Sequence, residues 1–252
     1  MDITDRRKEI INILKDREYV TVEEFSRVLG VSTVTIRTDL SALESDGALI
    51  RTHGGAMQSE KKSKQRFISN TMSENELEKK AIALKASSLI KDGSTIIIDS
   101  GSTTIHLAEN LKDKKITVVT NNILAQDILK NEESVNLIVL GGTLRRASMG
   151  TIGPIANNAV KSMNVDIFFL GAAAYNQEII SSYDIIEVEL KKNMIHSADK
   201  VVLLADSSKF GKKAFSTISS WDLIDTFITD KIDNDFREKL ENLGVEVILS
   251  NE

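Results

Sequence analysis

Apolar positions recur at helical spacing over residues 1–45, and they predict three short helices. The helices are expected over residues 5–16, 21–29 and 32–45. Thr21 and Glu24 fit a capping box at the start of the second helix, and Gly30 is the residue type that ends a helix. Ser32 can cap the third helix. Two helices joined by a short turn that contains glycine are typical of a helix-turn-helix motif.

The third helix can be oriented because successive residues turn by about 100° around a helix axis. Ile36, Leu40 and Leu43 then face the core, and Asp39 lies on the flank of the opposite face. That face carries hydroxyl groups, one arginine and one small apolar side chain, which suit contacts in the major groove of DNA. The candidate DNA-binding residues of this helix are Ser32, Thr33, Val34, Thr35, Arg37, Thr38 and Ser41. An ordinary solvated face is the alternative interpretation.

Residues 47–56 predict a small β wing after this helix. A strand is expected to begin at Leu49, and the glycine pair 54–55 favours a tight turn. Arg51 and His53 would lie on the wing, near the DNA backbone or the minor groove. For His53, a solvated loop histidine is the alternative.

From residue 73 onward, short continuous apolar runs alternate with helical stretches. This alternation is typical of a doubly wound, mostly parallel α/β sheet. The expected strands are Thr95–Ile98, Ile116–Val119, Val135–Leu140, Ile167–Leu170, Val201–Leu204, Thr226–Ile228 and Val245–Leu249. A capping box at Ser73 and Glu76 predicts a helix to about Ile90, and residues 184–197 predict another.

These patterns divide the chain into three parts. We expect a small α+β winged helix-turn-helix domain over residues 1–56, a polar and basic linker over 57–72, and a larger α/β domain over 73–252. Residues 1–66 hold 12 basic and 11 acidic side chains, whereas the remainder holds 20 and 26, so the net charge of −5 belongs to the larger part. This modest asymmetry does not establish DNA binding by itself.

The composition narrows the chemistry of the 252-residue chain. It has no cysteine, which excludes disulfides, thiolate metal sites and a cysteine nucleophile. His53, His106 and His196 lie far apart in the sequence, which disfavours a zinc site. No apolar run reaches the roughly 20 residues of a membrane span, and the charged N-terminus does not resemble a secretory signal. We therefore expect a soluble cytoplasmic protein with no metal, no cofactor and no membrane partner.

In doubly wound folds, ligands bind beyond the carboxyl ends of the strands. The first loop of this kind has Gly101 for a tight turn, four hydroxyl groups and the amides of a helix start, which together form a cradle for a phosphate. Its residues are Asp99, Ser100, Gly101, Ser102, Thr103 and Thr104. A simple helix cap is the alternative, and the lack of a Walker lysine argues against nucleotide hydrolysis.

Later loops and one helix add further candidate ligand contacts. They are Asn121, Asn122, Gly141, Gly142, Glu187, Lys191, Asp206 and Lys209. The two asparagine amides suit sugar hydroxyls, the glycine pair permits close approach of a ligand, and Lys209 is the best candidate for a cationic contact. Glu187 and Lys191 are four residues apart on a predicted helix, so they either form a surface ion pair or reach over the mouth of the pocket. Arg145 and Arg146 could neutralise a phosphate or be solvated.

The stretch Val31–Leu40, with Leu43, Gly47 and Arg51–Ala56, resembles the DNA-binding signature of the DeoR family of bacterial transcriptional regulators. The family usually reads Thr-Ile-Arg-Arg-Asp-Leu, whereas Thr38 here replaces the second arginine and offers only a weaker hydroxyl contact to phosphate. The loops Asp99–Thr104, Thr120–Asn122, Leu140–Gly142 and Leu204–Gly211 are similar to the C-terminal effector domain of the same family. Residues 172–182 depart from the family pattern.

The resemblance implies an α/β effector domain similar in fold to ribose-5-phosphate isomerase, which binds phosphorylated sugars. It also implies a DNA-binding regulator without enzymatic activity or catalytic residues, a repressor of a carbohydrate operon that forms a dimer or tetramer on operator DNA. Two alternatives stay open. One is a sugar-phosphate isomerase with an appended binding module and Glu187 as general base, although the acidic and lysine-glycine loops of that enzyme are missing. The other is a protein-interaction module with no role on DNA.

Overall fold

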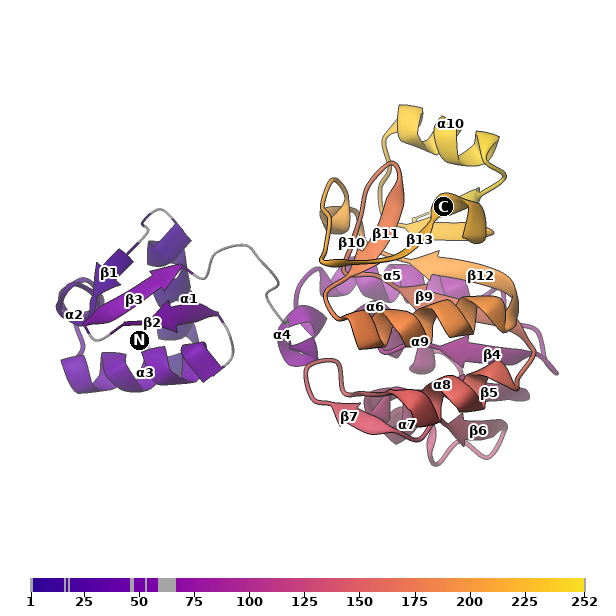
Figure 1. Cartoon of the computed structure of the whole chain (residues 1–252), viewed down its shortest axis with the longest axis horizontal. Helices are drawn as coiled ribbons and strands as arrows, with labels where there is room; N and C mark the ends of the chain where they lie inside the picture. Colours follow the sequence, from indigo (N-terminus) through magenta and orange to yellow (C-terminus); the bar gives the residue numbers. More distant parts are fainter. Residues whose placement is uncertain are drawn as a thin grey trace. The chain divides into compact units, whose positions relative to one another are not determined.

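The protein consists of two compact units, residues 1–66 and 67–252, in a computed structural model (Figure 1). The structure describes residues 2–15, 17, 19–45, 48–52, 54–58 and 67–251. Among these residues, no helix is both long enough and apolar enough to cross a membrane.

The smaller unit packs three helices against a three-stranded antiparallel sheet of order β1-β3-β2. Its elements are α1 (Ile3–Lys15), β1 (Tyr19–Thr21), α2 (Val22–Leu29), α3 (Thr33–Ser45), β2 (Leu49–Arg51) and β3 (Gly55–Gln58). The three predicted helices are confirmed to within two residues at each end. Phe25, Ile36 and Leu40 are fully buried in the core that these elements share.

The predicted helix signals of this unit are confirmed. Thr21 Oγ1 accepts a hydrogen bond from the Glu24 amide at 3.1 Å, and the Glu24 carboxylate accepts one from the Thr21 amide at 3.2 Å. Gly30 ends α2 in the left-handed conformation, with φ 67°. Ser32 Oγ accepts from the Thr35 amide at 3.2 Å. These local bonds satisfy amides that a helix start leaves unpaired.

The sheet differs from the predicted wing by one additional strand. β1 is only three residues long and pairs with β3, with Tyr19 opposite Met57 and Thr21 opposite Gly55. A side chain at Gly55 would place its Cβ 2.2 Å from the Val20 carbonyl oxygen, so glycine is required there by the approach of β1. The sequence analysis predicted only a turn at this glycine, because Tyr19–Thr21 has no continuous apolar run that would predict a strand.

The larger unit is built on a seven-stranded, wholly parallel sheet of order β15-β14-β12-β9-β4-β5-β6. The strands are β4 (Thr95–Ile98), β5 (Ile116–Thr120), β6 (Val135–Val139), β9 (Val165–Gly171), β12 (Ala198–Leu204), β14 (Thr226–Thr229) and β15 (Glu246–Leu249). All seven predicted strands are therefore confirmed. Residues 96–98 of β4, 168–170 of β9 and 202–204 of β12 are apolar and fully buried, because both faces of the sheet are covered there.

Helices cover both faces of this sheet (Figure 1). The helices α5 (Glu76–Ser87), α6 (Ser102–Ala108) and α7 (Ile123–Leu129) pack on one face, and α8 (Pro154–Lys161), α9 (Ile185–His196) and α10 (Asn234–Asn242) pack on the other. Successive strand residues serve the two cores in turn: Ile97 faces the α9 side, while Ile96 and Ile98 face the α5 side. The doubly wound prediction is confirmed.

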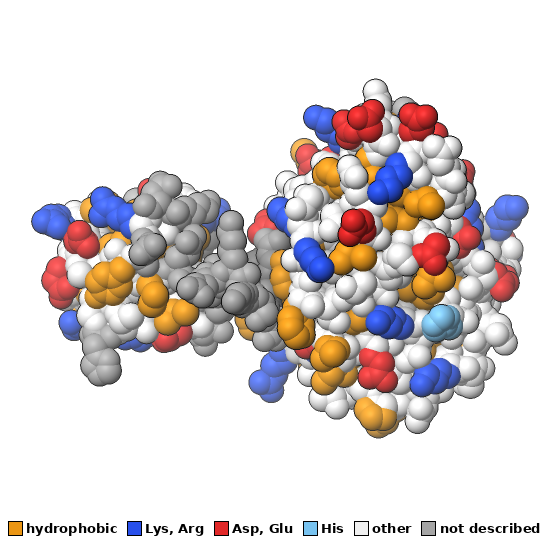
Figure 2. Space-filling model, turned by 45° about the horizontal axis from the view of Figure 1, so that its top comes forward, with side chains coloured by type: hydrophobic (Ala, Val, Ile, Leu, Met, Phe, Trp, Pro, Cys, Tyr) orange, Lys and Arg blue, Asp and Glu red, His pale blue; other side chains and the backbone are white. Residues whose placement is uncertain are grey.

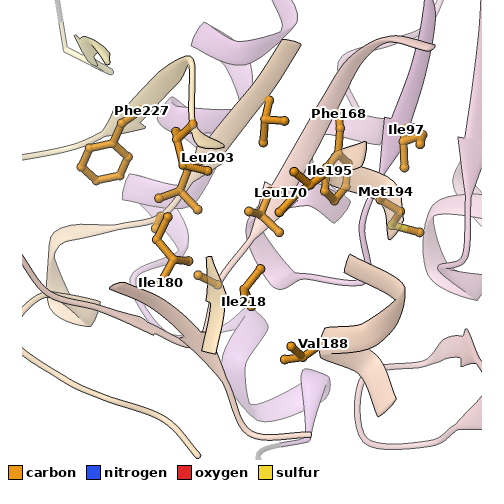
Figure 3. Packing of buried hydrophobic residues seen from close by; sticks show 14 of the residues in the cluster. Ile97, Phe168, Leu170, Ile180, Val188, Met194, Ile195, Leu203, Ile218 and Phe227 are labelled. Atoms are coloured by element: carbon orange, nitrogen blue, oxygen red, sulfur yellow. The ribbon is translucent and has the colours of Figure 1, made fainter. Parts of the chain in front are cut away.

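Two small antiparallel sheets flank the large sheet and were not predicted. One consists of β7 (Thr143–Arg145) and β8 (Gly150–Ile152); the other consists of β10 (Ala174–Tyr175), β11 (Ile179–Ser182) and β13 (Ser216–Ser220). Ile180 and Ile218 of the second sheet pack in the same core as Leu203 and Phe227 (Figure 3). Long-range packing, and not a local apolar pattern, holds these short strands in place.

The start of the larger unit differs from the prediction. Strand β3 and a short helix α4 (Ile68–Met72) take up the two ends of the expected linker, and the residues between them, 59–66, lie outside those described. The predicted capping box at Ser73 and Glu76 is wrong: Ser73 ends α4, and Asn75 precedes α5 without a side-chain cap bond. α4 belongs to the larger unit because Ile68 is buried and its amide donates to the Ala147 carbonyl at 2.6 Å.

Candidate functional site

The outer face of α3 is the candidate nucleic-acid surface. Ser32, Val34, Arg37, Thr38 and Ser41 are exposed, and Val34 retains 68% of its accessible surface. The other two candidates on this helix, Thr33 and Thr35, are half-buried. The orientation predicted from the helical period is therefore confirmed, with the apolar side of α3 in the core and a polar side in solvent.

Hydroxyl groups on this face are bonded within the helix. Thr38 Oγ1 donates to the Val34 carbonyl at 3.1 Å, and Ser41 Oγ donates to the Arg37 carbonyl at 2.9 Å. Arg37 makes no ion pair with any described residue. The guanidinium of Arg37 is consequently the cation that this face presents to a partner. The Thr38 and Ser41 oxygens present mainly their lone pairs, because their protons are donated within the helix.

Asp39 does not lie on the exposed flank of α3, as the sequence suggested. It is only 2% exposed, and its two oxygens accept hydrogen bonds from Arg6 Nε at 2.6 Å and Arg7 Nε at 3.1 Å. The carboxylate therefore ties α3 to α1. The helical angle placed Asp39 on the flank of the polar face, but only the position of α1 supplies the two arginines.

The wing also contacts α3. Arg51 Nη1 donates to Ser41 Oγ at 2.5 Å and lies 3.9 Å from the Glu44 carboxylate. Two of the predicted DNA contacts, Arg51 and Ser41, are thus bonded to each other across 10 residues of sequence. His53, the other wing candidate, lies outside the described residues.

The loop after β4 is the centre of the second candidate site, at the carboxyl edge of the large sheet. The Asp99 carboxylate is 1% exposed and accepts hydrogen bonds from the Ser100 amide at 2.6 Å, the Gly171 amide at 2.9 Å, and Lys191 Nζ. The chain's own carboxylate thus uses two of the amides around this loop. Thr103 Oγ1 is buried and has no partner among the described residues.

Lys191 is one member of a chain of alternating charges that runs from the buried Asp99 to the half-buried Asp184. The chain runs Asp99, Lys191, Glu187, Arg145 and Asp184. The Lys191 ammonium lies 3.6 Å from one Glu187 oxygen, and Arg145 Nη1 lies 3.2 Å from the other. Arg145 Nε then lies 3.1 Å from the Asp184 carboxylate. Three acidic and two basic groups give this chain a net charge of −1 when all are ionised.

The burial of Glu187 and Lys191 contradicts one of the two interpretations of this pair, the surface ion pair. Glu187 and Lys191 are 6% and 3% exposed, so the surface interpretation of this pair is wrong. Burial raises the pKa of the Glu187 carboxyl, although the Lys191 charge works against that change. Burial also acts on Asp184, but the amides of Glu187 and Ile186, together with Arg145, outweigh it and lower the pKa of Asp184.

Asn121 and Asn122 follow β5 and serve different purposes. Asn121 Nδ2 donates to the Thr151 carbonyl at 3.0 Å, and its Oδ1 has no partner in the described part of the chain. Asn122 Oδ1 accepts from the Leu124 amide at 2.8 Å and caps α7, so this side chain already has a structural role. A Cβ at Gly150 would lie 2.7 Å from Ser100 Cβ, which shows how closely β8 packs on the first loop.

Gly141 and Gly142 are exposed in the turn that leads to β7. Gly142 has φ 142°, and a Cβ there would lie 2.6 Å from the Ile152 carbonyl oxygen. Glycine is therefore required here by the close packing of the β7–β8 hairpin. The sequence analysis had instead attributed the glycine pair to the close approach of a ligand.

Asp206 and Lys209 lie in the loop that follows β12, at the same edge of the sheet. Asp206 is 1% exposed and accepts from Asn75 Nδ2 at 3.1 Å, while Lys209 Nζ donates to the Ala172 carbonyl at 2.9 Å. Burial opposes ionisation of Asp206, but the Lys209 charge and bonds from Ser208 and Asn75 outweigh it and lower its pKa. Sequence reasoning missed Asn75, which lies 131 residues away from Asp206.

Four loops are thus brought together because their strands are neighbours in the sheet order β12-β9-β4-β5. At the end of β9, the Gly171 amide donates to Asp99 and the Ala172 carbonyl accepts from Lys209, which links the loops after β4 and β12. Asn121 Nδ2, after β5, lies 3.5 Å from Ser100 Oγ of the first loop. Within the described residues, no group of three His, Asp or Glu side chains could hold a metal ion. Figure 2 shows acidic and basic side chains interspersed on the visible face of the larger unit.

Comparisons with known proteins agree with both units. The sequence profile of the "DeoR-like helix-turn-helix domain" matches residues 6–62, and that of the "DeoR C terminal sensor domain" matches residues 74–231. The lactose phosphotransferase system repressor of Lactococcus lactis is 38% identical over 229 residues, covering 89% of this chain and 90% of the relative. The transcriptional regulator GlpR of Haloferax volcanii is 36% identical over 248 residues, covering 97% and 96%.

Solved structures resemble the chain at lower identity. Ribose 5-phosphate isomerase A of Methanocaldococcus jannaschii is 22% identical, with 54% of this chain and 55% of that chain covered at a TM-score of 0.40. The translation initiation factor eIF-2B of Pyrococcus horikoshii is 12% identical, with 90% and 82% covered at a TM-score of 0.42.

A winged helix-turn-helix unit joined to a parallel α/β sensor unit defines the class of DNA-binding transcriptional regulators that carry their own sensor domain. Both profiles and the identities of its relatives place this chain within one family of that class. The chain belongs to the DeoR family of transcriptional regulators.

Proposed function

We propose that this regulator represses a carbohydrate operon and that a phosphorylated sugar, bound at the carboxyl edge of the large sheet, releases it from operator DNA. The names of its relatives support this proposal, since they include the lactose phosphotransferase system repressor and a putative aga operon transcriptional repressor of Escherichia coli O157:H7, which is 35% identical over 254 residues. A 100-fold loss of operator affinity needs a coupling of about 2.7 kcal/mol, which is within the usual range for allosteric proteins.

The observation that carries the proposal is the convergence of four loops that leave buried polar atoms without protein partners. Within the described residues, Thr103 Oγ1 and Asn121 Oδ1 are two such atoms. Buried polar groups in native proteins are almost always hydrogen-bonded, and a ligand can supply the missing partners. A sugar offers hydroxyl groups to both, since a hydroxyl can donate and accept.

Recognition of a phosphate at this site involves competition. Asp99 already accepts from Lys191 and from two amides, so an arriving phosphate shares these donors with a carboxylate or displaces it. Lys209, in the loop after β12, is a further cation at this edge of the sheet. We place the phosphate beside residues 99–104 and the sugar hydroxyls toward Asn121 and Asp206.

Operator recognition is proposed to rest on the exposed face of α3, with Arg37 reading a guanine edge or a phosphate. Two copies of this helix are needed to read two half-sites, so we propose a homo-oligomer, a dimer or a tetramer. Thr38 stands where the family usually has an arginine, and its hydroxyl is bonded to the Val34 carbonyl. We therefore expect fewer phosphate contacts in this protein and a shallower dependence of operator affinity on salt.

Enrichment of source-genome fragments on the purified protein near 150 mM salt tests this function, because non-specific binding falls steeply with salt. A sharp peak beside a carbohydrate operon is expected. Arg37→Ala should weaken binding to that fragment by about 1–3 kcal/mol, with Glu23→Ala on α2 as the matched surface control. Fragments bound without sequence preference by the wild-type protein would refute the proposal.

The isomerase alternative depends on Glu187 acting as a general base. Both of its carboxylate oxygens lie near cations, one at 3.6 Å from Lys191 and the other at 3.2 Å from Arg145. A base that is held in this way is poorly suited to take a proton from a sugar carbon. Proton NMR of pentose and hexose phosphates incubated with the protein should show no turnover; turnover that Glu187→Gln abolishes would establish the enzyme instead.

A further inference from the structure

The segment from α4 to the start of α5 contacts two other parts of the larger unit, and one of them is a loop of the ligand site. At the start of α4, the Ile68 amide donates to the carbonyl of Ala147, in the turn between β7 and β8. Just before α5, Asn75 Nδ2 donates to Asp206 Oδ1 at 3.1 Å and to Ser208 Oγ at 2.9 Å, in the ligand-site loop after β12. α4 is also the first described element that follows the DNA-binding unit in the chain.

Asn75 adopts a backbone conformation that favours glycine. Its φ and ψ are 49° and 44°, in the left-handed region that other residue types rarely enter and that asparagine tolerates better than most. An asparagine before a helix normally accepts a bond from an amide of the first turn, but this side chain makes no such bond. Its amide group donates to Asp206 and Ser208 instead. The side chain therefore bonds to residues that are distant in the sequence and does not cap α5.

The two helices at this junction are held together by a buried lysine. Lys79, in the first turn of α5, is 2% exposed, and its ammonium donates to the Glu74 carbonyl at 2.5 Å and to the Thr71 carbonyl. Both carbonyls lie at the end of α4 or just after it. Lys79 thus holds the end of α4 and the residue before Asn75 together. A displacement of Asn75 is therefore transmitted to α4.

We propose that Asn75 is a positioning residue that couples the state of the Asp206–Lys209 loop to the position of α4, and so to the chain leading to the DNA-binding unit. The proposal rests on the proposed function of the ligand site. Asp206 Oδ2 has no hydrogen-bond partner among the described residues. A ligand hydroxyl that donates to this oxygen turns the carboxylate and weakens the bond from Asn75 to Oδ1. Loss of that bond removes the contact that holds Asn75 in its left-handed conformation. The Asn75–Asp206 bond is then a feature of the state that binds operator DNA.

Asn75→Asp separates this role from a purely structural one. Aspartate has the same shape, caps helices as well as asparagine does, and also tolerates the left-handed region. It replaces a donor by a carboxylate facing Asp206, which repels it. A role limited to the helix start predicts no loss for this variant. The coupling role predicts weaker operator binding without any ligand.

The test uses the full chain and a duplex selected from a random-sequence library on the wild-type protein. In fluorescence anisotropy without ligand, Asn75→Asp and Asn75→Gly should each bind that duplex about fivefold or more weakly than wild type. Asn70→Ala is the matched control, since this α4 side chain is exposed, and it should bind as wild type does. Hydrogen exchange should become faster in peptides covering residues 68–74 of the Asn75 variants and stay unchanged in α9.

Wild-type operator affinity in Asn75→Asp or Asn75→Gly would overturn the inference, and so would an equal loss in Asn70→Ala. Unchanged exchange over residues 68–74 would overturn it as well. Failure of the proposed function has a different signature, because the selection would then yield no preferred duplex for the wild-type protein.

Discussion

Replacing Asp39 by asparagine tests how the recognition helix is held. The change keeps the size of the side chain and removes its charge. Asp39 is 2% exposed and pairs with Arg6, which is 8% exposed, and with the more accessible Arg7. We expect α3 to stay folded but to separate from α1 more often, because a buried guanidinium would lose its counter-charge.

The magnitude follows from the burial of each partner. Breaking a buried ion pair costs about 3–5 kcal/mol, and a pair with an accessible partner contributes about 1 kcal/mol or less. Asparagine still offers Arg6 one oxygen, and a hydrogen bond to a charged group is worth about 1.5–3 kcal/mol, so part of the loss is recovered. The expected net destabilisation is about 2–3 kcal/mol. A unit of 66 residues has a total stability of about 3–10 kcal/mol, so the loss is a large share.

Hydrogen exchange followed by mass spectrometry on the full chain measures this effect unit by unit. Peptides from α1 and α3 should exchange about 30–150-fold faster in Asp39→Asn, which is the stated free energy expressed as a rate ratio. Peptides from β4 and β9 should not change. Arg7→Ala is the control for the accessible half of the pair, and its acceleration should be about fivefold or less.

A much smaller acceleration of hydrogen exchange would refute the reasoning. If α1 and α3 of Asp39→Asn exchanged within about threefold of wild type, the carboxylate would not be what holds these helices together. The double variant Arg6→Met, Asp39→Leu provides a further check, since apolar side chains of similar volume can replace a buried ion pair without loss of stability. It should regain most of the protection that the single variant loses.

Three further predictions concern the larger unit. Ser102→Asp should abolish the response to the phosphorylated sugar and leave operator binding intact, because it sets a negative charge against the phosphate; release of DNA by the effector in this variant would place the phosphate elsewhere. Lys191→Met should lower the free energy of unfolding in urea by about 3 kcal/mol, because Asp99 would stay buried without its cation, and adding Asp99→Asn should restore most of it. Asp206 has a lowered pKa in the folded state, so its contribution to stability is present above its unfolded pKa of about 3.9 and is lost as the pH falls through the folded value. Thermal unfolding of Asp206→Asn between pH 6 and pH 3 (about the range of carboxyl titration) should therefore depend less on pH than that of wild type, and parallel curves would contradict this.

Periodicity and helix-end signals in the sequence predicted the elements that depend on neighbouring residues. The helices α1, α2 and α3 and the seven strands of the large sheet were predicted because their apolar patterns are long enough to be distinctive. The cap at Thr21 and the turn at Gly30 were predicted for the same reason, since both act within a few residues. The candidate ligand loops followed from the rule that parallel strands bring their carboxyl ends to one edge.

Contacts between segments that are distant in the sequence determined the elements and bonds that the sequence did not predict. Strand β1 exists because β3 pairs with it, and Asn75 does not cap α5 because Asp206 lies within reach of its side chain. Asp39 is buried because α1 brings Arg6 to it across 33 residues.

The ligand site shows the same division. Its residues were named from their positions after the strands, but the chain of charges from Asp99 to Asp184 was not foreseen, because Arg145 enters it from the β7–β8 hairpin. The sequence determined which side chains stand at the edge of the sheet. The tertiary structure decided their partners, because a charge that is removed from water takes whichever counter-charge the fold places beside it.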